Sequence, residues 1–355
     1  YRALWSNIDF AKGVLGKTIK KGDNTISILP MAHMYGMSFE FLFEFLHGCH
    51  VFYLTRVPSP AIIAQAFKDV KPAIVIAVPL VIEKIIRKKV FPQIQNTKVK
   101  LLMKMPGVGK KVKKRICEQV YQAFGGNLYE VIIGGAALNQ EIESFLKDID
   151  FPFTVGYGAT ECAPIITYSD WHDFVPMSCG REVVHMEVKI DSENPETVPG
   201  EILARGLNVM LGYYKNDEAT AQTIDKDGWY HTGDLGLMDK GGNVFIKGRS
   251  KNMLLGPNGQ NIYPEEIEDK LNSMTFAMES VVVQRDGKLV GLVHPDFDEV
   301  QAMGLSRDDL QSLMEENRVQ VNANLPVYCK IAAIEIHDEE FEKTPKKSIK
   351  RYLYK

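Results

Sequence analysis

Three short strings carry residue types suited to binding nucleotides and metal ions. In the first, VGYGATE, Gly156 and Gly158 allow the backbone to approach a ligand closely, and Tyr157 offers a flat face for a purine base. Thr160 can donate a hydrogen bond to a phosphate oxygen. Glu161 can supply an oxygen ligand to Mg²⁺, which usually takes one or two carboxylates together with phosphate oxygens. The alternative for this string by itself is a buried loop with a helix-capping threonine.

The second string, GWYHTGDLG, places Asp234 on a turn between Gly233 and Gly236. A carboxylate in that position can accept hydrogen bonds from both hydroxyls of a ribose, although a TGD turn without function has the same composition. The third string, FIKGRSKNMLLGPNGQNIYPEEIE, carries the basic residues Arg249 and Lys251 at a break between two kinds of sequence.

A small-residue turn, GGAAL, joins a predicted strand to a predicted helix. The segment LYEVIIGGAAL reads as a strand ending at Ile133, a turn, and a helix capped by Asn139. The small side chains allow a planar base to lie against the backbone. Open α/β sheets bind ligands at the carboxyl ends of their strands, which is where this turn is expected.

The elements that must position these strings follow two patterns. From Thr25 to Thr154, short runs rich in Val and Ile, such as ISILP, VFYL and AIVIAV, alternate with helical stretches, including one over residues 37–46. Apolar runs without strict alternation are typical of a parallel sheet covered on both faces. From about Cys179, apolar residues alternate with polar ones, which predicts antiparallel strands.

A small α+β domain is expected after residue 250. The segment SVVVQRDGKLVGLV predicts a hairpin on an Asp-Gly turn, Pro264 and Ser306 begin helices, and KIAAIEI predicts a further strand. The expected fold class is therefore α/β. A large region with βαβ sheets and a β-rich subdomain spans residues 1–250, and the small domain spans residues 251–355.

Composition narrows the classes of function. A net charge of −3 argues against sequence-independent binding of nucleic acid. The five cysteines lie far apart without a CxxC pair, which indicates neither a disulfide framework nor a zinc site and favours a reducing cytoplasm. No apolar run reaches the roughly 18 residues of a membrane-spanning helix. The first residues, YRALWSNIDF, lack an initiator Met and the features of a signal peptide, so the chain is expected to begin inside a longer protein.

The three strings, in this order, resemble the adenylate-forming enzymes, which include acyl-CoA synthetases. The resemblance extends from PMAHMYGM to EKTPKKSIKR. It implies Mg²⁺ and ATP as cofactors and coenzyme A as co-substrate. It also implies a hinge at Lys251, a rim of the acyl pocket at His33 and Tyr35, and catalytic roles for Thr160 and Glu161, the latter as metal ligand. The implied nucleotide-binding residues are Gly134, Gly135, Ala136, Ala137, Gly156, Tyr157, Gly158, Asp234, Ile246 and Arg249.

The chain departs from the family pattern at two points. The phosphate loop of the form SGTTGxPKG lies upstream of the first residue, so the chain itself is expected to bind ATP weakly and not to turn over. The family signature TxSGKIxR reads here as TPKKSIKR, which places Ser348 at the position of the catalytic lysine. A hydroxyl cannot replace a cation, so either Lys347 reaches in from one residue away or other positive groups act. Lys347 is preferred, because its flexible stem tolerates the offset.

The string PGEILARGLNVMLGYYKN, followed by GWYHTGDLG, looks most like fatty acyl-CoA synthetases. A long-chain fatty acid–CoA ligase is thus the expected activity. An acyl-ACP ligase, an aryl-CoA ligase and a non-catalytic nucleotide-binding protein remain as alternatives. The basic run between Lys98 and Ile116 favours a solvated surface in a cytoplasmic protein, with peripheral contact to an anionic membrane as its alternative. Chain length of the acid and oligomeric state, including the homodimer frequent in the family, are not fixed by the sequence.

Overall fold

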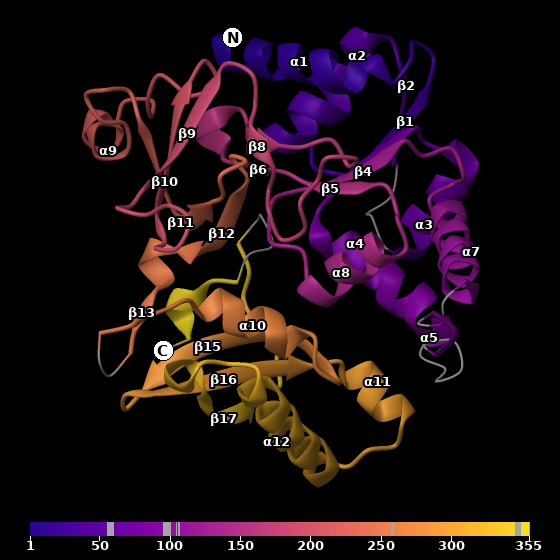
Figure 1. The fold of residues 1–355 in the computed structure, drawn as a ribbon, viewed down its shortest axis with the longest axis vertical. Helices are drawn as coiled ribbons and strands as arrows, with labels where there is room; N and C mark the ends of the chain where they lie inside the picture. Colours follow the sequence, from indigo (N-terminus) through magenta and orange to yellow (C-terminus); the bar gives the residue numbers. More distant parts are fainter. Residues whose placement is uncertain are drawn as a thin grey trace. The chain divides into compact units, whose positions relative to one another are not determined.

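The computed structural model describes residues 1–54, 60–94, 101–103, 105, 107–256, 259–344 and 349–354 (Figure 1). They form two compact units. Unit 1 comprises Tyr1–Thr232 and Gly236–Ile246, and unit 2 comprises Gly233–Leu235 and Lys247–Lys355. The mixed α/β class expected from the sequence is confirmed. The predicted domain boundary at residue 250 stays a prediction.

A layer of parallel strands forms the centre of unit 1. It consists of a two-stranded sheet, β1 (Asn24–Ser27) and β2 (His50–Tyr53), and a three-stranded sheet, β3 (Ile74–Ala77), β4 (Glu130–Ile133) and β5 (Phe153–Val155). β1 pairs in parallel with β2, β3 with β4, and β4 with β5. The amide of Ala73 donates to the carbonyl of Asn24 at 2.9 Å, which places β1 beside β3. Every residue of β3 and β4 is buried, as the Val- and Ile-rich runs predict.

Helices cover both faces of this layer of strands (Figure 1). They are α1 (Arg2–Val14), η1 (Leu15–Lys17), the π-helix η2 (Gly36–Phe43), α2 (Glu44–His47), α3 (Pro60–Val70), α4 (Pro79–Ile85), the π-helix η3 (Ile86–Val90), α5 (Phe91–Ile94), α7 (Val108–Ala123) and α8 (Gln140–Asp148). Val75 and Val131 pack with α3, α4, α7 and α8. Ile74 and Ile132 point to the opposite face, because successive strand side chains alternate, and pack with α1 and η2.

A buried carboxylate marks the end of strand β1. β1 stops at Ser27, inside the apolar run ISILP. Glu40 of η2, fully buried, accepts hydrogen bonds from the amides of Ile28 at 3.1 Å and Leu29 at 2.9 Å, and from the hydroxyl of Ser27 at 3.0 Å. The strand ends here because this side chain, rather than a neighbouring strand, accepts hydrogen bonds from the two amides.

The remainder of unit 1 is rich in antiparallel strands, as expected. They are β6 (Tyr157–Gly158), β7 (Ile165–Tyr168), β8 (Arg181–Glu182), β9 (Met186–Asp191), β10 (Gly200–Gly206), β11 (Tyr230–Met238) and β12 (Val244–Arg249), with η4 (Thr160–Cys162) and α9 (Asp217–Thr223) between them. Residues 233–235 of β11 and 247–249 of β12 belong to unit 2. β9 pairs antiparallel with β10, and its residues Met186 and Ile190 are buried while Glu187 is exposed. The alternating pattern therefore identified this region correctly.

Unit 2 is the small α+β assembly that the sequence predicts. It contains η5 (Ser250–Asn252), β13 (Leu254–Leu255), β14 (Asn261–Ile262), α10 (Pro264–Asn272), β15 (Ala277–Arg285), β16 (Lys288–Pro295), α11 (Phe297–Ala302), α12 (Arg307–Ala323), η6 (Val327–Cys329), β17 (Ile331–Ile336) and η7 (Arg351–Leu353). Asp286 and Gly287 join β15 to β16, and both have positive φ, as a type I′ hairpin requires. Ser306 and Asp309 form the predicted capping box at the start of α12.

The described part of the basic run lies largely in helix α7. Ile116 and Val120 face the core, whereas Lys113 pairs with Asp148 at 2.5 Å on the surface. Among the residues with a described conformation, no helix is long and apolar enough to cross a membrane. Contact of this basic surface with a membrane stays a prediction.

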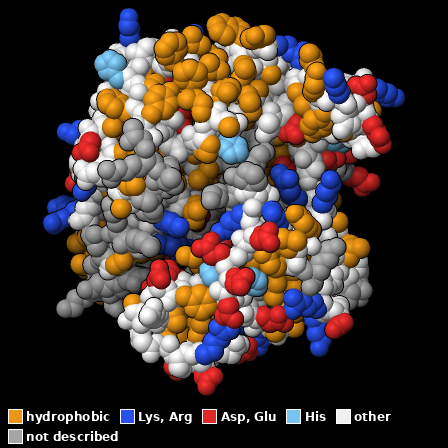
Figure 2. Space-filling view, turned by 180° about the vertical axis from the view of Figure 1, so that it is seen from behind, with side chains coloured by type: hydrophobic (Ala, Val, Ile, Leu, Met, Phe, Trp, Pro, Cys, Tyr) orange, Lys and Arg blue, Asp and Glu red, His pale blue; other side chains and the backbone are white. Residues whose placement is uncertain are grey.

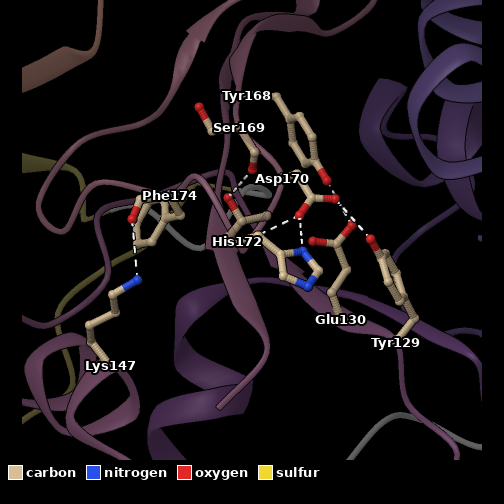
Figure 3. A network of polar contacts seen from close by, with 9 residues as sticks. Tyr129, Glu130, Lys147, Tyr168, Ser169, Asp170, His172 and Phe174 are labelled. Carbon is tan, nitrogen blue, oxygen red and sulfur yellow. Dashed lines mark hydrogen bonds and ion pairs between the residues drawn. The ribbon is translucent and has the colours of Figure 1, made fainter. Parts of the chain in front are cut away.

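A network of polar side chains near the start of β4 extends from the buried Glu130 and Tyr168 to the exposed His172 (Figure 3). The hydroxyl of Tyr168 donates to Glu130 at 2.7 Å, and the hydroxyl of Tyr129 donates to Asp170 at 2.9 Å. Asp170 also accepts from the amide of His172 at 3.0 Å and contacts its ring nitrogen Nδ1 at 2.5 Å. Burial raises the pKa of Glu130 to about 8, so this carboxyl is largely protonated at neutral pH.

Glu130 is expected to make unit 1 less stable as the pH rises. The unfolded state releases this proton near its ordinary pKa, whereas the folded state retains it up to about pH 8. Stability therefore falls between these two pH values, by at most about 5 kcal/mol. In Glu130→Gln the unfolding free energy, measured by urea denaturation, should differ less between pH 5 and pH 8 than it does in the unmodified chain. The exposed Glu141→Gln is the control, and an unchanged pH dependence in Glu130→Gln would contradict the assignment.

Candidate functional site

Two glycine-containing segments meet at the carboxyl edge of the parallel sheet. Because β4 and β5 are neighbours, the turn that follows Ile133 lies beside the segment that follows Val155, and the amide of Gly156 donates to the carbonyl of Ile133 at 2.9 Å. The turn residues Gly135, Ala136 and Ala137 are exposed. Asn139 then caps α8 with its side chain, as predicted. The structure thus brings the two predicted nucleotide-binding segments of unit 1 together.

The structure gives separate reasons for the glycines of VGYGATE. At Gly158 an added Cβ would lie 2.1 Å from the carbonyl oxygen of Pro164, so glycine is required there by the close approach of the chain to itself. At Gly156 the corresponding space is ordinary, 3.4 Å from the nearest atom. Tyr157 is 8% exposed and packs in the second core of unit 1. Its predicted stacking on adenine stays a prediction, because most of the ring is covered.

Tyr35 lies against the small-residue turn. Its hydroxyl donates to the carbonyl of Ile132 at 3.1 Å, and its ring passes 3.2 Å from the position of a Cβ on Gly134. Glycine at 134 therefore makes room for the tyrosine. His33 begins the turn that leads into η2, and its carbonyl accepts from the amide of Met37. The segment predicted to line the acyl pocket, which contains Tyr35, therefore lies beside the turn at Gly134 that was predicted to line the adenine pocket.

Glu40 is a positioning residue that the sequence did not assign. Its three hydrogen bonds fix the backbone at the end of β1, from which the segment leading to His33 and Tyr35 departs. Burial raises its pKa to about 7. An acidic residue within the apolar stretch FEFLFEF was the available signal, but the identity of its partners depends on the fold.

Glu161 is held by aromatic hydroxyls. Tyr213 donates to its carboxylate at 2.8 Å, and the carbonyl of Glu161 accepts from the amide of Met210 at 2.7 Å. The buried Tyr230 lies close enough that Glu161 contributes to raising the pKa of its hydroxyl, after burial itself. Glu161 follows Thr160 in the short helix η4. An anchored carboxylate beside a threonine hydroxyl is a donor set that suits Mg²⁺ when phosphates complete the coordination.

Asp234 and Arg249 contact each other in unit 2. Arg249 Nε lies 3.1 Å from Asp234 Oδ1, and the aspartate side chain is 12% exposed while that of the arginine is 70% exposed. The sequence assigned both to ribose, and the structure brings them together. Ile246, in β12, is partly exposed, and Lys251 in η5 is exposed.

The predicted catalytic residue Lys347 lies outside the described residues, as does Ser348. Both sides of this gap are anchored. Lys343 and Ile349 form an isolated antiparallel β-bridge. Lys350 Nζ lies 3.0 Å from Oε2 of Glu342. Arg351, which the sequence used only to align the signature, forms an ion pair with Glu268 of α10.

The model of the AMP-binding enzyme family matches residues 2–214. Among curated proteins, the long-chain-fatty-acid–CoA ligase ACSBG2 of Rattus norvegicus is 28% identical over 80% of this chain and 46% of its own length. Long-chain-fatty-acid–CoA ligase 1 of Saccharomyces cerevisiae is 28% identical over 79% of this chain and 43% of its own length. The chain thus spans about half the length of these relatives.

Solved structures of adenylate-forming enzymes share the fold. The O-succinylbenzoate coenzyme A synthetase of Bacillus subtilis, in complex with AMP, superposes with a TM-score of 0.75 at 19% identity, covering 100% of this chain and 65% of the other. The ATP-bound MatB of Rhodopseudomonas palustris gives a TM-score of 0.73 at 20% identity, covering 99% and 63%. At these identities the likeness concerns the fold alone. With 213 of its 355 residues matched by the family model, the chain belongs to the AMP-binding enzyme family.

Proposed function

We propose that the whole protein activates a fatty acid with ATP and transfers the acyl group to the thiol of coenzyme A. The observation that carries the proposal is the meeting of the turn after β4 with the segment from Gly156 to Glu161, which ends in an anchored carboxylate. Ligands of open α/β sheets bind at this edge. The names of the relatives support a long-chain acid as the substrate.

The reaction has two steps. In the first, a carboxylate oxygen of the acid attacks the α-phosphorus of ATP, the bond to the β-phosphate oxygen breaks, and pyrophosphate leaves. In the second, the thiol sulfur attacks the acyl carbonyl carbon, the bond to the AMP oxygen breaks, and the thiol proton is released. Both steps require positive charge or hydrogen-bond donors near the phosphate oxygens.

The residues of this chain take distinct parts in the proposal. Glu161 and Thr160 would hold Mg²⁺, which neutralises phosphate charge when bound. Asp234, with Arg249 against it, would accept hydrogen bonds from the ribose, and Lys347 would offset the charge at the α-phosphate. The exposed Lys251 would act as the hinge of a rotation that exchanges the two half-reactions.

The acid and the acceptor can be identified from the product. Whole protein with ATP and Mg²⁺ would receive hexadecanoic acid or benzoate, together with coenzyme A or an acyl carrier protein, and mass spectrometry would detect the thioester. We expect hexadecanoyl-CoA. Asp234→Ala should lower its rate about 100-fold through the loss of two hydrogen bonds to a charged group, whereas the exposed Asp338→Ala should not. Benzoyl-CoA or an acylated carrier as the main product would contradict the proposed specificity.

A further inference from the structure

The loop that carries Glu161 has an open limb and a buried limb. It spans residues 159–164 and joins β6 to the antiparallel strand β7. Thr160 is exposed and Glu161 is half-buried, whereas residues 162–165, the buried limb, are covered. Buried backbone amides and carbonyls need hydrogen-bond partners, because they are withdrawn from water. Partners for the buried limb must therefore come from other parts of unit 1.

Two asparagines hold the ends of the buried limb. Asn7 of α1 donates from Nδ2 to the carbonyl of Cys162 at 3.1 Å and accepts from the amide of Ile165 at 3.0 Å. Asn208, which follows β10, donates to the carbonyl of Ile165 at 2.7 Å. Both asparagine side chains are fully buried. Figure 2 shows hydrophobic side chains gathered on the surface at the level of α1, but Asn7 lies on the buried side of that helix.

A hydroxyl holds the middle of the same limb. Ser38 of η2, which is also fully buried, donates to the carbonyl of Ala163 at 2.8 Å. Ala163 has a φ of 59°, a left-handed conformation that residues other than glycine adopt infrequently. The turn of the chain at this point thus depends on support from its surroundings. We call the side chains of Asn7, Ser38 and Asn208 the buried clamp.

The buried clamp holds the backbone beside the proposed metal ligand. Glu161 directly precedes Cys162, its carboxylate accepts from Tyr213 at 2.8 Å, and its carbonyl accepts from the amide of Met210 at 2.7 Å. Displacement of a reacting group by about 1 Å can lower a rate about 100-fold. We infer that the buried clamp positions the Glu161 carboxylate for Mg²⁺ before any ligand binds. The inference rests on the proposed function, because it concerns the carboxylate to which that proposal assigns the metal.

Nucleotide affinity with and without Mg²⁺ tests the inference in the absence of turnover. Isothermal titration calorimetry of the whole protein would use α,β-methylene ATP, which cannot be cleaved at the α-phosphorus. Mg²⁺ should tighten binding in the unmodified protein. In Asn7→Ala and Ser38→Ala this tightening should be about 10-fold smaller, as is typical when a group that orients a metal ligand is removed. Affinity without Mg²⁺ should not change, because the clamp does not touch the nucleotide.

Two further variants separate the possible outcomes. Asn24→Ala removes the bond from another asparagine amide to a backbone carbonyl, that of Val70, at the start of β1. This control should lower the melting temperature without changing the effect of Mg²⁺. If only Glu161→Gln loses the effect of Mg²⁺, the inference is wrong and the metal site stands. If Glu161→Gln retains the effect, both are wrong. Equal weakening with and without Mg²⁺ in the clamp variants would show general loosening and would also overturn the inference.

Hydrogen exchange gives an independent check in the 355-residue chain. The amide of Ile165 loses its acceptor in Asn7→Ala, so a peptide covering residues 162–168 should contain an amide that exchanges at least ~10-fold faster. Mass spectrometry would measure the rate, and Asn24→Ala should leave it unchanged. Unchanged exchange in Asn7→Ala would show that this side chain does not hold the buried limb, and would overturn the inference.

Discussion

Arg351→Ala is expected to destabilise unit 2 by about 3–5 kcal/mol, because it leaves the buried carboxylate of Glu268 without its cation. The side chains of Glu268 and Arg351 are only 10% and 20% exposed. Burial raises the pKa of Glu268 to about 7 even though the arginine acts against that shift. The unfolding free energy of the variant, measured by urea denaturation, would report the loss.

The loss should be larger at pH 8 than at pH 5. Without Arg351 the pKa of Glu268 rises further above its value in the unfolded chain, so stability declines as the pH rises through that interval. Arg307→Ala is the matched control, because its ion pair with Asp338 is exposed and should contribute less than about 1 kcal/mol. Similar losses of unfolding free energy in the two variants would show that the ion pair of Arg351 stabilises unit 2 no more than an exposed ion pair does.

Glu161→Gln should lower ATP-dependent activity of the whole protein by a factor of about 100 to 1,000. Removal of one well-placed electrostatic group at a reacting phosphate typically has this effect. The amide also binds Mg²⁺ less strongly, so the Mg²⁺ concentration that gives half-maximal rate should rise. Initial rates of pyrophosphate release at several Mg²⁺ concentrations would measure both effects.

Tyr213→Phe tests whether activity depends on the position of the Glu161 carboxylate as well as on its presence. The variant removes the 2.8 Å hydrogen bond to Glu161 but leaves the carboxylate, and its expected loss is about 10-fold. Glu187→Gln, which changes an exposed carboxylate paired with Arg205, should retain full activity. If Glu161→Gln releases pyrophosphate as fast as the Glu187→Gln control, Glu161 does not take part in catalysis.

Local sequence signals predicted much of the fold. The buried strands β3 and β4, the Asp-Gly hairpin and the caps at Asn139 and Ser306 all depend on residues close together in the chain. The order of strand, turn and helix also predicted that the turn at Gly134 and Gly135 lies at the carboxyl end of its strand. These features were predictable because hydrophobic period, turn chemistry and capping act over a few residues.

Long-range partners were beyond prediction from the sequence. Glu40 ends β1 from 13 residues away, Tyr213 reaches Glu161 across 52 residues, and Arg351 reaches Glu268 across 83. The local sequence around each of these residues does not identify its partner. What makes each residue important is burial beside one particular group, and only the packing of the whole unit decides that. The same holds for Tyr157, whose ring joins a core that its string does not reveal.

The most direct test of the central claim is pyrophosphate release by the whole protein supplied with ATP, Mg²⁺ and fatty acids of several lengths, alongside Asp234→Ala and Lys347→Ala. The account predicts release only when a fatty acid is present, reduced at least about 100-fold in both variants. Release that is independent of the acid, or no release with any acid, would contradict it.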